Sequence, residues 1–239
     1  MEASSDAVSC AKGFSEHQWR LWNLLSFLDP FIEGKKAFDV LDIGGTEVSE
    51  NVLARKFPGS NISVLNTRPK SARNFVIGDA QEMPFHGEAF DILVCIELIE
   101  HVYSPQKVFS EAFRVGRANS LFLFTTPNMN ACYNRILVPL GFMPANYTVI
   151  PYRQYGYFLP KGRRHETGQD HCRIFNLQAL TLAMQALRFN ILRTFGVNYS
   201  EPGHRFSLLR KCMARIMWKT LCENIGVVAS KADVGQERP

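Results

Sequence analysis

Short apolar runs alternate along this chain with stretches in which apolar residues recur at helical spacing. Five apolar runs predict strands, at residues 38–43, 62–65, 74–77, 90–96 and 120–125. Helices are predicted between them at about residues 49–57 and 104–115, the second with Ser104 as its N-cap. Nearly continuous apolar strands that alternate with helices indicate a parallel sheet covered on both faces.

The two ends of the chain and one internal segment depart from this alternation. An amphipathic helix is predicted over residues 14–31, ending near Pro30. Residues 130–170 are rich in proline, glycine and tyrosine and predict an inserted lid, followed by a helix at 177–187, a strand at 190–195, a helix at 206–222 and a strand at 225–229. The predicted organisation is an N-terminal helical cap over residues 1–37 and one α/β domain over residues 38–239.

Composition narrows the class of protein. The chain has 239 residues and a formal net charge of +5, which permits contact with anionic partners but does not require it. Its six cysteines show no C-x-x-C spacing, which argues against a zinc site and a disulfide framework and favours a cytoplasmic protein. No apolar run is long enough to predict a membrane-spanning helix, and the first residues do not resemble a secretory signal.

Polar residues gather where the predicted strands end. Asp42, Gly44 and Gly45 follow the first strand, Asp79 follows the third, and His101 lies shortly after the fourth. In an open parallel sheet, ligands bind at the carboxyl ends of the strands. Glycines there let the backbone approach a ligand, although a plain strand-to-helix turn explains the glycine pair equally well when it is taken alone.

Taken together, these segments resemble a known family. The run VLDIGGT at residues 40–46 resembles the first motif of class I S-adenosylmethionine-dependent methyltransferases, GDAQEMPF at 78–85 their third-strand motif, and FDILVCIELIEHV at 90–102 their fourth-strand motif. The EHV ending, TPN at 126–128 and His171 with Phe175 are similar to a small-molecule branch that includes ubiquinone-pathway O-methyltransferases. The resemblance covers residues 38–129 well and 171–231 loosely. It implies a Rossmann-like, seven-stranded, mostly parallel sheet whose last strand is antiparallel.

The resemblance also implies roles for individual residues in binding S-adenosylmethionine. Asp42 and Gly44, with Gly45 in the same turn, would line the methionine part of the cofactor. Asp79 would accept a hydrogen bond from the adenine amino group, with Ala80 beside the ring, and Ile96 would close over the middle of the cofactor.

Two positions depart from the family pattern. The family usually has three glycines in the first loop, whereas this chain has two followed by Thr46 and Glu47, so either a residue is deleted or a glycine is replaced. Asn66 stands where an acid usually grips the ribose hydroxyls. The amide oxygen of Asn66 can still accept a hydrogen bond, but a neutral acceptor is weaker than a carboxylate, so weaker cofactor binding is expected. The alternative function is that of a catalytically silent binding or scaffold protein.

The predicted reaction is methyl transfer to a small or lipid-like acceptor, with oxygen as the acceptor atom by resemblance. A hydroxyl acceptor needs a base, and His101 is the candidate, a helix-capping or packing role being the alternative. Glu100 is a candidate for orienting a neighbour, and His165 and His171 flank the predicted lid. No spacing specifies a metal, so no metal is expected.

Expectations for larger partners come from charge and periodicity. The predicted helix at residues 206–222 pairs a basic face with an apolar face, so it is either a peripheral membrane contact or an ordinary helix that covers the sheet. No basic patch interleaved with aromatic residues appears, so nucleic acid is not an expected partner.

Overall fold

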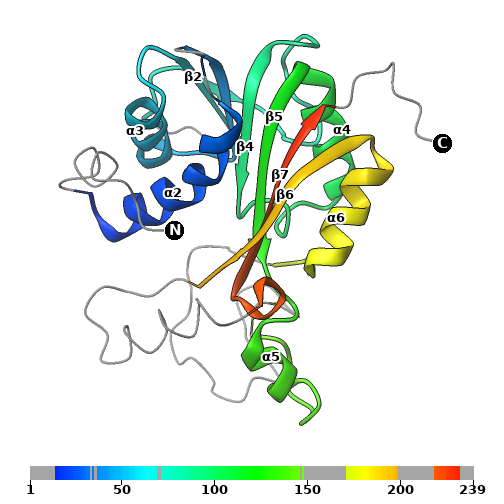
Figure 1. Ribbon diagram of the computed structural model, residues 1–239. Coiled ribbons are helices and arrows are strands. Elements are labelled where there is room, and N and C mark those ends of the chain that lie inside the picture. The colour runs from blue at the N-terminus through cyan, green and yellow to red at the C-terminus, as the bar shows by residue number, and fades with distance from the viewer. Residues whose placement is uncertain are drawn as a thin grey trace.

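The fold is built on one seven-stranded sheet. The computed structural model describes residues 14–32, 34, 37–68, 71–145, 147, 171–198 and 218–231. The strands are β1 (Asp39–Ile43), β2 (Asn61–Asn66), β3 (Phe75–Ile77), β4 (Phe90–Ile96), β5 (Gly116–Pro127), β6 (Phe189–Val197) and β7 (Asn224–Lys231). Their order is β3-β2-β1-β4-β5-β7-β6 (Figure 1). The first five are parallel, and β7 runs antiparallel to both β5 and β6. The predicted Rossmann-like architecture is confirmed.

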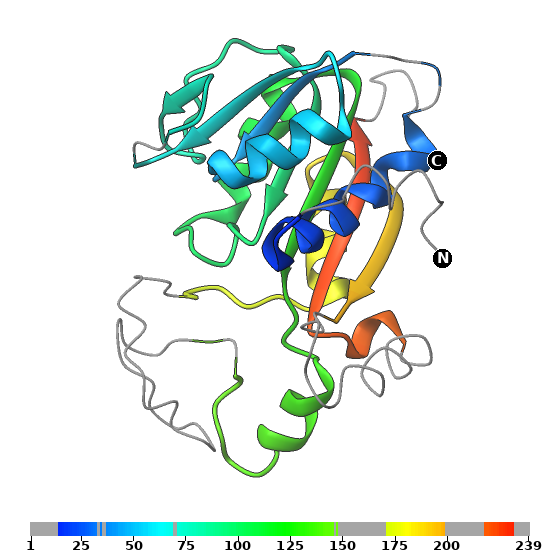
Figure 2. The ribbon, with the colours of Figure 1, turned by 90° about the vertical axis from the view of Figure 1, so that its left-hand side faces the viewer.

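Helices cover both faces of this sheet. Helices α2 (Glu16–Leu25) and α3 (Glu47–Lys56) lie on one face, and α4 (Pro105–Val115) and α6 (Leu177–Ala186) lie on the other (Figures 1 and 2). Successive strand residues point to opposite faces. Accordingly, Leu93 packs into the core under α4 and α6, whereas its neighbours Ile92 and Val94 pack into the core under α2 and α3.

The ends of several helices differ from the prediction. The α-helical part of the first helix ends at Leu25, and a 3-10 turn, η1 (Ser26–Phe31), continues through Pro30. Helix α4 begins where expected, but the Ser104 side chain makes no capping hydrogen bond. The backbone N–H of Ser104 instead donates to Oε1 of Gln81 at 2.8 Å. The predicted long helix at 206–222 is wrong at its C-terminal end, where η2 (Lys219–Leu221) is a short 3-10 turn; residues 206–217 lie outside the described residues.

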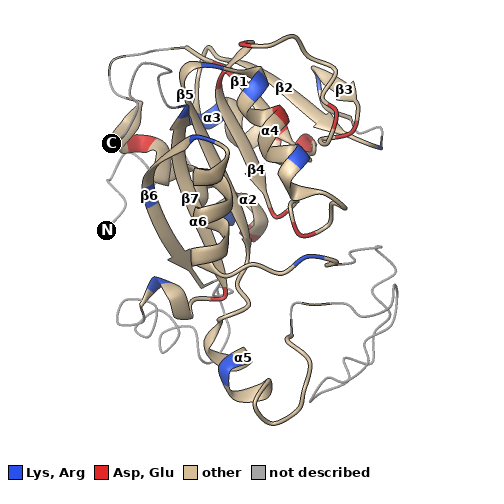
Figure 3. Cartoon of the chain, turned by 90° about the vertical axis from the view of Figure 1, so that its right-hand side faces the viewer, with Lys and Arg blue, Asp and Glu red and all other residues tan. Residues whose placement is uncertain are grey.

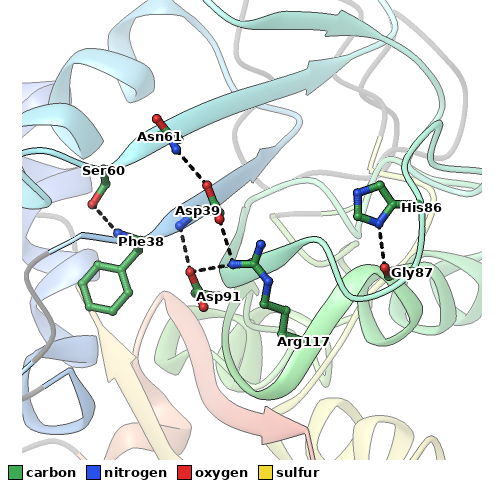
Figure 4. Close-up of polar contacts among 8 residues, drawn as sticks. All are labelled: Phe38, Asp39, Ser60, Asn61, His86, Gly87, Asp91 and Arg117. Atoms are coloured by element: carbon green, nitrogen blue, oxygen red, sulfur yellow. Dashed lines mark hydrogen bonds and ion pairs between the residues drawn. The ribbon is translucent and has the colours of Figure 1, made fainter.

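In the central strands β1, β4 and β5, the charged residues lie near the ends of the strands (Figure 3). At the amino-terminal edge, the Arg117 guanidinium donates to Oδ2 of Asp39 at 2.8 Å and to Oδ2 of Asp91 at 2.9 Å (Figure 4). The Asp39 backbone N–H also donates to Oδ2 of Asp91 at 2.9 Å. These bonds link the starts of β1, β4 and β5 on the edge opposite the predicted site.

A small lobe follows β5 and projects beyond the sheet, carrying α5 (Cys132–Leu137) (Figure 1). Buried Asn128 fixes the point where the lobe joins the sheet. Its side-chain amide donates to the backbone oxygens of Thr220 at 3.0 Å and Cys222 at 2.7 Å. The lobe falls within the segment predicted as a lid, although residues 148–170 of that segment, with His165, lie outside the described residues. Among the helices that the structure describes, none has the length and apolar character to cross a bilayer.

Candidate active site

The glycine turn connects β1 to α3 in a geometry that requires both glycines. Gly44 adopts a φ of +82°, a left-handed conformation that side chains with a Cβ rarely adopt, and its N–H donates to the Leu65 oxygen at 2.7 Å. A Cβ at Gly45 would lie 2.0 Å from Oδ2 of Asp42. Thr46, which follows the glycine pair, is the N-cap residue of α3, and its N–H donates to Oγ of Ser49 at 2.7 Å.

Asp42 places a buried carboxyl beneath this turn. The residue is 3% exposed, and its Oδ2 has no hydrogen-bond partner within the described part of the chain. Burial raises the pKa of Asp42 to about 7, with a further contribution from Glu50, while the Ser49 side chain opposes the shift. An orphaned carboxyl oxygen under a glycine turn fits a ligand that brings a positive charge, such as the amino group of S-adenosylmethionine.

Asn66, at the end of β2, contacts the turn directly. Its side-chain N–H₂ donates to the oxygens of Gly44 at 3.2 Å and Gly45 at 2.9 Å, and its Oδ1 accepts from the N–H of Arg68 at 3.3 Å. Both ends of the amide are therefore engaged within the protein. A ribose hydroxyl would therefore compete with the Arg68 N–H for Oδ1, the atom that we expected to face the ribose.

The third-strand motif lies on the same edge of the sheet. The Gly78 N–H donates to the backbone oxygen of Asn66 at 3.1 Å, so hydrogen bonds through Asn66 connect the glycine turn to the Asp79 segment. Asp79 is exposed and accepts from the backbone N–H of Gln81 at 2.8 Å, while Ala80 is buried. The structure thus brings the two segments predicted to bind the cofactor to one edge of the sheet, with β2 between them.

The end of β4 packs against the glycine turn. Ile96 is half-buried, and Glu97 adopts a φ of +50°, a conformation that costs a non-glycine residue about 1–3 kcal/mol. The Leu98 side chain lies 3.0 Å from the position that a Cβ on Gly44 would take. Such strain concentrates at functional sites, and here the strained residue is followed by Leu98, which packs against the turn.

A second cluster forms just beyond β4. Glu100 is 1% exposed, and its Oε2 accepts from the Thr126 hydroxyl at 3.1 Å. Its Oε1 lies 4.0 Å from Nε2 of His101, whose side chain is 25% exposed. Burial raises the pKa of Glu100 to about 8, with a smaller contribution from Glu97. The His101 ring meets the His171 ring edge-on, with the centroids 4.7 Å apart.

This cluster reveals an arrangement that the sequence spacing did not indicate. One ligand atom from each of Glu100, His101 and His171 lies within 4.8 Å of the others, so the three side chains could hold a metal ion. His171 lies beside His101 because the next two residues are bound to the chain there. The backbone N–H groups of Cys172 and Arg173 donate to the backbone oxygen of Glu100 at 2.9 and 3.0 Å. His101 itself lies in a turn before α4, with its N–H donating to the Leu98 oxygen at 2.9 Å, and it does not cap that helix.

Comparisons with known proteins agree with the fold and the motifs. The family model described as a methyltransferase domain matches residues 37–124, the segment that carries β1 to β4 and most of β5. Together with the seven-stranded sheet and its glycine turn, this match shows that the chain carries a methyltransferase domain and supports S-adenosylmethionine as its cofactor.

Two relatives share a more specific name than the family model. The chain is 26% identical over 235 residues to the ubiquinone biosynthesis O-methyltransferase of Paracidovorax citrulli (strain AAC00-1), covering 86% of this chain and 91% of that one. It is 24% identical over 137 residues to the protein of the same name from Coxiella burnetii (strain Dugway 5J108-111), covering 57% of this chain and 52% of the relative, so it spans about half of that protein's length.

Solved structures support the fold alone. A SAM-dependent methyltransferase from Methanosarcina mazei aligns with a TM-score of 0.57 at 16% identity, covering 86% of this chain and 96% of that one.

Proposed function

We propose that this methyltransferase acts on a hydroxyl oxygen of a small or lipid-like acceptor and that His101 removes the proton. The observation that carries the proposal is the half-exposed imidazole of His101 beside the buried carboxyl of Glu100, at the edge of the sheet that also carries the glycine turn. The names of the relatives support an oxygen acceptor.

The protein's own side chains have a limited set of tasks in this reaction. Bound S-adenosylmethionine supplies an activated methyl group on a positively charged sulfur. Asp42 and the glycine turn would hold its methionine part, and the Asp79 segment would hold the adenine. Positioning of two reactants can supply roughly 7–11 kcal/mol of the barrier. The imidazole of His101 would accept the hydroxyl proton as the acceptor oxygen takes the methyl group that the cofactor would supply.

Exposed apolar side chains in the lobe that follows β5 support a lipid-like acceptor. In the lobe after β5, Ile136 is 60% exposed, Leu140 is 65% exposed, and Val138 between them is also exposed. Their segment folds back onto α5, where the N–H of Ala145 donates to Oδ1 of Asn134 at 2.9 Å. An apolar tail on the acceptor would find a partner surface there.

The test compares four methyl acceptors and two single histidine variants. Labelled S-adenosylmethionine is incubated with a catechol, the same catechol carrying an alkyl tail, an aromatic amine and a thiol. Transfer to the catechols, with a lower KM for the tailed one, is expected. His101→Ala should lower kcat by about 10²–10⁴-fold with cofactor affinity intact, whereas His86→Ala, an exposed histidine whose Nδ1 contacts the Gly87 oxygen, should not.

Two outcomes would contradict the proposal. Transfer to the amine or thiol alone would remove the oxygen acceptor. Loss of wild-type activity after dialysis against a chelator, with recovery on adding a divalent cation, would assign His101 to a metal site instead of a base role.

A further inference from the structure

The side-chain amide of Asn66 has its hydrogen-bonding capacity directed at the protein backbone. Its two N–H groups meet two carbonyl oxygens, 3.2 Å away on Gly44 and 2.9 Å away on Gly45, and its oxygen meets the Arg68 N–H at 3.3 Å. The opposite orientation of the amide would set an oxygen against two oxygens and an N–H₂ against an N–H. The contacts therefore fix which end faces the turn.

A carboxylate cannot replace this amide. An ionised acid is an acceptor without a donor, so an aspartate at position 66 would set a carboxylate oxygen against the same two carbonyl oxygens. The family's usual acid and the asparagine of this chain thus suit different arrangements of the turn. Here β2 also supports the turn through its backbone, since the Leu65 oxygen accepts from the Gly44 N–H at 2.7 Å.

Close packing also constrains the turn. Gly44 is in a left-handed conformation, and Gly45 packs so closely on Asp42 that no side chain fits. Thr46 begins α3 directly after them. We infer that Asn66 is a positioning residue, which holds the Gly44–Gly45 turn in the form that receives the methionine part of the cofactor, and is not a ligand of the ribose.

This inference rests on the proposed placement of the cofactor over the turn, and a pair of ligands tests it. S-adenosylhomocysteine carries both the adenosine and the amino-acid part, whereas 5′-methylthioadenosine carries the adenosine and lacks the amino-acid part. Their affinities are measured by calorimetry for the wild type, Asn66→Ala and Asn66→Asp. In both variants the affinity for S-adenosylhomocysteine should fall by about tenfold or more, equivalent to about 1.4 kcal/mol, while that for 5′-methylthioadenosine should stay within about twofold.

The control is Asn61→Asp, at the opposite end of β2, where the amide donates to Oδ1 of Asp39 at 2.9 Å. It makes the same chemical change far from the turn and should leave both affinities unchanged. Near-ultraviolet circular dichroism confirms that each variant is folded, and Asn66→Ala carries the test if Asn66→Asp is not.

The outcomes separate the two claims. Equal losses for both ligands in Asn66→Ala, or tighter binding by Asn66→Asp, would make Asn66 a ribose ligand and overturn the inference. A wild type that binds neither ligand would instead refute the cofactor placement on which the proposed function depends.

Discussion

The carboxyl of Glu100 lies 4.0 Å from the imidazole of His101, with its other oxygen held by the Thr126 hydroxyl at 3.1 Å. The two residues are neighbours in the sequence, yet one is buried and the other is half-exposed. A buried acid next to a solvent-reached imidazole gives the imidazolium formed on proton transfer a counter-charge. That counter-charge exists when the acid is ionised, which links the reaction to pH.

The first prediction concerns this pair. Because burial raises the pKa of Glu100 to about 8, the fraction of ionised carboxylate increases as the pH rises through that value. The kcat of the wild type should therefore rise through about pH 8, and Glu100→Gln should remove that rise and lower the plateau. Steady-state kinetics over about pH 6 to 9 measure this. A pH profile of Glu100→Gln identical to that of the wild type would show that Glu100 does not act on His101.

The second prediction concerns Asp42 in the ligand-free protein. Its pKa is raised from 3.8 to about 7, so between these values the folded protein keeps a proton that the unfolded chain has lost. The free energy of unfolding should therefore fall as the pH rises from about 4 to about 7, and Asp42→Asn should weaken that fall. Urea unfolding at several pH values within this window gives the slopes.

Asp39→Asn provides the contrast for that experiment. Hydrogen bonds from Asn61 and Arg117 lower the pKa of Asp39, so its contribution to stability is lost as the pH falls below its usual value of 3.8. This variant should change the pH dependence in the acid range and leave the slope above it intact. If Asp42→Asn has the wild-type slope throughout, the buried carboxyl is ionised in the folded protein and the prediction is wrong.

The third prediction concerns the glycine turn. Gly45→Ala would place a methyl group 2.0 Å from Oδ2 of Asp42, so the turn or the carboxyl must move. We expect a loss of about 1–3 kcal/mol in stability and at least about a tenfold loss in affinity for S-adenosylmethionine. Gly87→Ala is the matched control, because its new Cβ would lie an ordinary 3.4 Å from the Arg114 oxygen. Unimpaired cofactor binding by Gly45→Ala would exclude the turn from the site.

The fourth prediction concerns the opposite edge of the sheet. Arg117→Met removes the guanidinium that joins Asp39 and Asp91, and because these side chains are 39%, 36% and 18% exposed the loss should be about 1 kcal/mol or less. High salt should reduce the difference from the wild type. The affinity for S-adenosylmethionine should not change. A variant that loses cofactor affinity without losing stability would show coupling between the two edges.

The sequence predicted the central strands β1 and β4 well because they are mostly buried on both faces and therefore read as apolar runs. The extension of β5 back to Gly116 could not be read in this way, since residues 116–119 (Gly, Arg, Ala and Asn) form no apolar run. The order of the strands came from family resemblance and not from periodicity.

The site was predicted less completely, for a physical reason. Strand ends gave Asp42, Gly44 and Gly45, which the structure brings together. The contacts of Asn66 with the turn depend on how β2 aligns with β1, and the meeting of His171 with His101 depends on a chain return across 70 residues. Both are set by tertiary pairing, which leaves no local pattern.

The strand order also has a consequence for how the molecule forms. Strand β7 is the last strand of the described chain to be synthesised, and it lies between β5 and β6. Strand β6 stands at the edge of the sheet and forms its backbone hydrogen bonds with β7. During translation β5 and β6 must therefore wait with open edges until residues 224–231 leave the ribosome. Because such late, non-local pairing is slow and leaves strand edges available to other chains, assistance from chaperones would matter most at that final insertion.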